Sequence, residues 1–151
     1  MTESSEAEAP LRTGWAPMVP ELLVSDIQAS LDFWRGRLGF RIAYSRDGFV
    51  YLERPEGAQI MLSERDGTFE TGAMEVPFGR GAMFQLYLRG VDMIAEAFAA
   101  RGNSLLMPTR EVWRRTGDRE SGQREFFVQV PDGYLVMVAE TIGERPLAGS
   151  R

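Results

Sequence analysis

The sequence predicts an α+β fold of two βαβββ modules that form a curved mixed sheet with the helices outside. The first observation is a repeat: PEGAQIMLSE at 55–64 and PDGYLVMVAE at 131–140 share a proline, an acid, a glycine, an apolar run and a glutamate. The second is that a strand pattern and a helix pattern precede each copy. One such unit leaves an apolar face and open edges, so two are expected to pair around a hollow that holds a ligand.

The first module is expected over about 17–65. A strand pattern at 18–24 is followed by Ser25 or Asp26, and either side chain is a suitable helix N-cap. The helix is expected to end at Gly39, and three short strands with turns at RDG and RPEG follow it, at about 40–45, 48–54 and 58–63. Apolar residues recur at helical spacing between the cap and the glycine, at Ile27, Leu31, Trp34 and Leu38.

The second module is expected over about 82–141. It begins with a strand at 83–88 and a helix that starts near Val91 and ends at Gly102. Because the second copy is longer, an inserted loop is expected within PTREVWRRTGDRESG, and long loops are often functional. The remaining strands are expected near 104–107, 123–130 and 134–140.

The polar ends of the chain show no periodicity, so 1–16 is expected to be a disordered lead-in and 142–151 a tail. Residues 17–141 between them are expected to form a single two-module domain. No apolar run reaches the length of a membrane span, and no secretory signal precedes the first module. We therefore expect a cytoplasmic protein with no membrane partner.

Composition excludes several kinds of chemistry. The chain has no cysteine, histidine or lysine, so all 17 basic residues are arginine. Thiolate nucleophiles, imidazole bases and lysine Schiff bases are therefore ruled out. A net charge of −5 argues against a nucleic-acid partner and favours cationic or neutral ligands.

The segments LLVSDIQASLDFWRGRLGF and PDGYLVMVAE resemble the vicinal oxygen chelate superfamily, which contains glyoxalases, bleomycin-resistance proteins and dioxygenases. The resemblance runs from about Pro17 to Glu140. With VPELLV, LYLRGVD and QREFFVQ it is closest to bleomycin-resistance proteins. It implies a homodimer that sequesters a bleomycin-type antibiotic in a cleft between subunits. Pro20 matches the proline near which that family exchanges an N-terminal strand, and it equally fits a simple edge-strand proline.

The resemblance also locates the metal ligands of the superfamily's enzymes. They fall near Val19 or Glu21, at Phe84 or Gln85, and at two methionines, Met61 and Met137. Thioethers suit only soft ions. We therefore expect no metal, no cofactor and no catalytic residue. The alternative is a lyase, isomerase or dioxygenase that uses Glu21 and Gln85, and a third class is a regulatory module for another natural product.

The expected ligand site combines aromatic groove residues, a hydroxyl and adaptable methionines. Arg110, Arg114 and Arg115 in the expected loop indicate either an anionic ligand or a solvated basic face. The candidate ligand-binding residues are Tyr44, Phe49, Met61, Ser63, Gln85, Trp113 and Met137.

Overall fold

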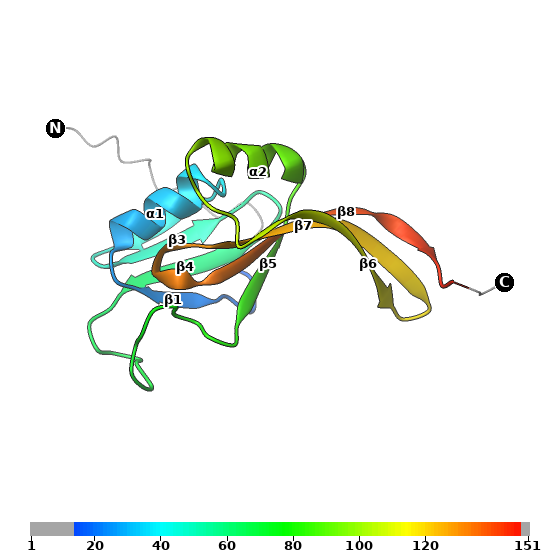
Figure 1. Ribbon diagram of the computed structural model, residues 1–151. Helices are drawn as coiled ribbons and strands as arrows, with labels where there is room; N and C mark the ends of the chain where they lie inside the picture. The colour runs from blue at the N-terminus through cyan, green and yellow to red at the C-terminus, as the bar shows by residue number, and fades with distance from the viewer. Residues whose placement is uncertain (1–13, 149–151) are drawn as a thin grey trace. The chain divides into compact units, whose positions relative to one another are not determined.

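The computed structural model describes residues 14–148, and the chain divides into two compact units, the first ending at Val76 and the second beginning at Pro77. Each unit has one helix and one four-stranded sheet in βαβββ order, as the repeat predicts (Figure 1). The expected lead-in residues 1–13 and the last three residues lie outside the described part. Neither helix within 14–148 is long and apolar enough to cross a membrane.

The first unit forms a mixed sheet in the order β1-β4-β3-β2, in which only β1 and β4 run parallel. Side chains alternate across it, and Leu22, Leu52 and Leu62 are buried on one face. Glu64, on the same face of β4, accepts a hydrogen bond from Ile27 N at the start of the helix (3.3 Å). That face is therefore the one that the helix covers. The elements are β1 (Glu21–Val24), α1 (Ile27–Gly36), β2 (Arg41–Arg46), β3 (Phe49–Glu53) and β4 (Gln59–Glu64).

Helix α1 has the cap and the buried stripe that its sequence predicts. The Asp26 side chain accepts hydrogen bonds from Gln28 N (3.0 Å) and Ala29 N (3.1 Å), which satisfies two of the free amides at the helix start. Leu31 and Trp34 are buried, and the Trp34 ring packs edgewise on Phe40 at 5.4 Å.

The second unit forms the corresponding sheet, β5-β8-β7-β6, with β5 and β8 parallel. Its helix packs through Phe98 on Phe126, whose rings are 5.7 Å apart, and Val91 N donates to Glu140 (3.1 Å). The elements are β5 (Met83–Tyr87), α2 (Val91–Ala100), β6 (Met107–Thr116), β7 (Arg119–Gln129), a short 3-10 turn at Pro131–Gly133 and β8 (Leu135–Pro146).

The expected inserted loop and the expected strand at 104–107 are both wrong. The segment folds as a β-hairpin, because β6 continues to Thr116 and turns into β7 at Gly117, whose φ is +68°. Gly117 supplies the backbone conformation that a tight two-residue turn needs. The register shifts between Met107 and Arg110, next to Pro108. Proline has no backbone N–H to donate to the neighbouring strand, so regular pairing is interrupted there.

Two expected boundaries also change. Strand β8 runs to Pro146, so the first residues of the expected tail pair with the lengthened β7 from Gly122 back to Arg119. At the other end, residues 14–16 of the expected disordered lead-in lie against the first unit. Gln59 accepts a hydrogen bond from Ala16 N (2.9 Å) and donates one to Gly14 O (2.6 Å).

Candidate ligand site

The face of the first sheet that α1 does not cover, called the open face, brings four of the predicted site residues together. Cross-strand register sets Phe49 opposite Ser63 and Tyr51 opposite Met61, and Tyr51 is in turn opposite Tyr44. Met61 and Tyr44 pack against a buried cluster that contains Phe49 and Tyr51. Strand alternation places all of these side chains on one face.

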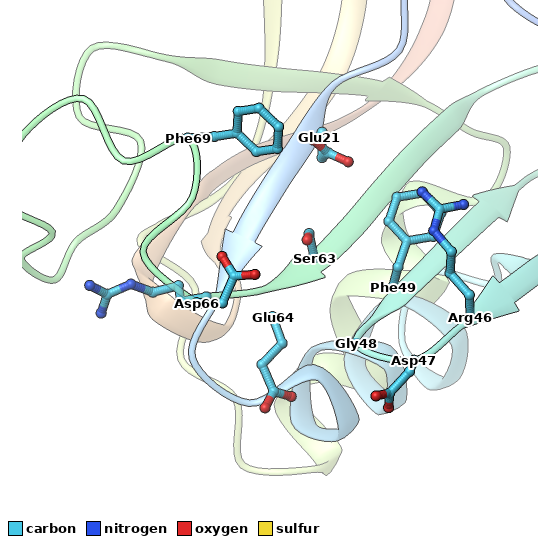
Figure 2. Close-up of a pocket in the computed structure, with 10 residues that line it drawn as sticks. Glu21, Arg46, Asp47, Gly48, Phe49, Ser63, Glu64, Asp66 and Phe69 are labelled. Carbon is cyan, nitrogen blue, oxygen red and sulfur yellow. The ribbon is translucent and has the colours of Figure 1, made fainter.

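A cavity of about 420 Å³ lies at one end of this face (Figure 2). Its volume falls within the ~300–1,000 Å³ of small-molecule sites. It contains two predicted residues, Phe49 and Ser63, together with the β2–β3 turn and the end of β4. The lining residues are Glu21, Arg46, Asp47, Gly48, Phe49, Ser63, Glu64, Arg65, Asp66 and Phe69.

The cavity carries an excess of negative charge, because four carboxylates and two guanidiniums line it. Arg65 pairs with Glu70 (2.6 Å), and Arg46 stacks over the Phe49 ring at 3.8 Å, as Figure 2 shows. Thr68 N donates to the Asp66 carboxylate (2.8 Å) and lowers the pKa of Asp66, so this group is ionised at neutral pH. A cation entering the cavity therefore meets a favourable potential.

Phe69 is a cavity residue that sequence reasoning missed. It belongs to the link after β4, where no periodic pattern marks it, and its φ is +64°. A left-handed conformation costs about 1 kcal/mol or more for a residue with a side chain. Figure 2 shows its exposed ring on the Glu21 side of the cavity, where it adds an aromatic surface to the acidic lining.

The positions that would hold a metal ion have the same register in both units. Glu21 is opposite Met61, and Gln85 is opposite Met137. Met137 is buried, with its sulfur 3.9 Å from Gln123 Nε2. Within residues 14–148 no three acidic side chains gather closely enough to hold an ion. One oxygen donor beside one thioether does not fit a divalent ion that needs nitrogen or oxygen ligands.

The remaining predicted residues lie in the second unit. Gln85 is exposed and accepts a hydrogen bond from the Tyr87 hydroxyl (2.9 Å). Trp113 lies opposite Gly122 in the hairpin, and the Arg145 guanidinium is 4.1 Å from its ring centre. Met137 is opposite Phe127, which is roughly 15 Å further along β7 than Gly122. The structure therefore does not bring Trp113 to Met137 and Gln85.

The arginines that suggested an anionic ligand are engaged by a buried carboxylate. Arg114 donates to both oxygens of Glu125 (2.6 and 3.0 Å), and Arg110 donates to one of them (3.3 Å). Gln123 adds a further hydrogen bond (2.8 Å). These donors, Arg114 foremost, lower the pKa of Glu125 to about 2. Arg115 donates to Gly117 O within its own turn.

The duplicated units and the cavity on an open sheet face define a class of two-module α+β proteins suited to small ligands. The sequence from 17 to 138 matches the model of the Glyoxalase/Bleomycin resistance protein/Dioxygenase superfamily. The chain therefore belongs to that superfamily. No curated protein shows a significant sequence match to it.

Similar solved structures support the same fold. A protein of unknown function from Agrobacterium tumefaciens strain C58 is 26% identical, with a TM-score of 0.63 over 85% of this chain and 96% of that one. A virulence protein from Salmonella typhimurium is 20% identical, with a TM-score of 0.64 over 82% and 94%. A superfamily member from Alicyclobacillus acidocaldarius is 18% identical, with a TM-score of 0.58 over 83% and 91%.

Proposed function

We propose that this protein binds a cationic small molecule in the acidic cavity of its first unit, without a metal ion or cofactor. The observation that carries the proposal is the lining, in which four carboxylates outnumber two guanidiniums and the exposed Phe69 adds an aromatic ring. Carboxylates attract a cation, and aromatic faces hold an apolar or planar group beside it. The thioethers at the superfamily's metal positions support a role in binding rather than in metal-dependent catalysis.

The specific ligand that we propose is a bleomycin-type antibiotic. The protein would sequester the drug, and the cell would thereby become resistant to it. Such a drug is a cationic glycopeptide with planar heterocycles. The acidic cavity suits its positive charge, and the half-buried Tyr44 and the exposed Phe69 offer aromatic surface for its rings. A cavity of about 420 Å³ takes one arm of so large a molecule, so the rest of the drug would lie along the open face.

Binding of metal-free bleomycin in the presence of EDTA tests this function. Isothermal titration is expected to show saturation near one drug per chain, with a Kd in the micromolar range or below. Asp47→Asn and Asp66→Asn each remove a cavity charge while keeping the shape of the side chain. Each is expected to weaken binding several-fold, and more at low salt.

Asp118→Asn is the matched control, because Asp118 is an exposed residue in the β6–β7 turn. It makes the same change in net charge outside the cavity and is expected to leave the affinity unchanged. A wild-type protein that does not bind the drug would rule out the bleomycin proposal. Equal weakening by all three substitutions would show that net charge, and not the cavity, determines binding.

We also infer a homodimer, with the ligand cleft at the subunit interface. The face of the second unit's sheet opposite α2 supports this inference, because it leaves the apolar side chains Met83, Tyr87 and Met107 exposed on the two edge strands, β5 and β6. Exposed apolar side chains favour association. Sedimentation equilibrium is expected to give about twice the chain mass of 17.0 kDa. Tyr87→Asp is expected to increase the monomer fraction, and a monomeric wild type would contradict the inference.

A further inference from the structure

A short segment, Gly14–Ala16, is fixed across the open face of the first unit by a single side chain. The Gln59 amide donates to Gly14 O (2.6 Å) and accepts from Ala16 N (2.9 Å), so it holds the backbone on both sides of Trp15. The Tyr51 hydroxyl donates to the same Gln59 oxygen. Gln59 is itself buried in β4, so the segment is attached to a rigid part of the sheet.

The Trp15 ring, held by this segment, stands across a pair of stacked tyrosines. Tyr44 and Tyr51 lie 5.2 Å apart with their planes 20° from parallel. The Trp15 ring is 5.8 Å from Tyr44 and 5.1 Å from Tyr51, at angles of 72° and 88°. Phe49 is 5.8 Å from Tyr44 and also lines the acidic cavity. A row of packed aromatic rings therefore runs from the cavity to Trp15, with Phe49 and Tyr51 buried in it.

Trp15 stays largely in solvent although its neighbours are covered. Its exposed fraction is 66%, whereas that of Tyr51 is 2%. A tryptophan that serves only as a packing anchor is normally well buried. Here the backbone is hydrogen-bonded and one part of the indole rests on the tyrosines, while most of the ring surface remains available for contact.

We propose that Trp15 and Tyr44, packed on the buried Tyr51, form an aromatic subsite for a planar ring, next to the acidic cavity that receives the positive charge. This proposal rests on the proposed function and narrows its ligand class to planar aromatic cations. Trp15 is the residue that selects a planar ligand, because its exposed indole face stacks on the ring. Gln59 is a positioning residue that holds Trp15 over the subsite.

Two probes of equal charge and different shape test the subsite. Proflavine is a planar aromatic cation, and hexylammonium is an aliphatic one. Trp15→Ala is expected to weaken proflavine binding about tenfold, Trp15→Phe less, and neither is expected to change hexylammonium binding. Gln59→Leu is expected to act like Trp15→Ala, because it releases the segment. Trp113→Phe, in the other unit, is the control and is expected to change neither affinity.

The possible outcomes separate the subsite from the function on which it rests. If Asp47→Asn weakens both probes while Trp15→Ala changes neither, the cavity proposal stands and the subsite is wrong. If Trp15→Ala weakens both probes equally, Trp15 has only a structural role and the subsite is again wrong. If wild-type protein binds neither probe, both proposals fail. Thermal unfolding of each variant checks its folding, and an exposed Trp15 predicts little change in Tm.

Discussion

Replacement of Gly79 by alanine is expected to lower the free energy of unfolding by about 2–4 kcal/mol. The backbone at Gly79 has a φ of +70°, where any side chain adds strain. The added Cβ would also lie 2.5 and 2.8 Å from two carbons of the Tyr134 ring. Tyr134 is buried and packs edgewise on Phe78 at 6.0 Å, so its ring has little room to move.

Gly81→Ala is a matched control for this substitution. Gly81 has a φ of +89°, and its added Cβ would meet nothing within 4 Å. It therefore shares the backbone strain without the steric clash, and is expected to cost about 1–2 kcal/mol. Urea unfolding of the two variants isolates the contribution of the Tyr134 contact as their difference. Equal losses of stability in the two variants would show that the Tyr134 ring moves aside without an energetic cost.

Replacement of Arg114 by methionine is expected to cost about 2–3 kcal/mol at neutral pH. Glu125, the partner of Arg114, has an exposed fraction of 0%, and Arg114 is its only bidentate donor among the described residues. Without Arg114 the buried carboxylate keeps only Arg110 and Gln123. Arg124→Met is the control, because Arg124 pairs with Asp92 at the surface, where ion pairs contribute at most about 1 kcal/mol.

The effect of the Arg114 substitution is expected to depend on pH. Arg114 and the other donors lower the pKa of Glu125 from an ordinary 4.5 to about 2 in the folded protein. This group therefore stabilises the wild type fully above about pH 4.5, and the stabilisation is lost as the pH falls through about 2. The stability difference between wild type and Arg114→Met should shrink over the same range. A difference that is constant with pH would contradict a charged Glu125 as its cause.

Most of the fold could be predicted because local signals and the repeat agree. Asp26 caps α1, and the repeated turns precede β4 and β8. The β6–β7 hairpin was missed because charged residues occupy both faces of these strands, so period-2 hydrophobicity is absent. Apolar and polar residues alternate along a strand only where one of its faces covers a core. Thr116 and Arg119 are both exposed, so this pattern is missing there.

The candidate site could be predicted only where it depends on strand register. Phe49 and Ser63 line the cavity because both point to the open face from neighbouring strands. Trp15 and Gln59 were missed because their contact joins residues far apart in the sequence. Phe69 was missed because it lies in an irregular link. Contacts of this kind depend on tertiary packing, which periodicity does not encode.

The long β7 strand has a consequence for local stability. Arg124 bonds to Asp92 of α2, and from Glu125 onward β7 pairs with the part of β8 that β5 also flanks. From Arg119 to Gly122, its partners among residues 14–148 are its two neighbouring strands, with surface ion pairs such as Arg145 with Glu120. Amide hydrogens in the outer part should therefore exchange through fraying, at a free energy well below that of global unfolding. A single strand is thus expected to unfold in two steps, its outer part opening while its inner part stays folded.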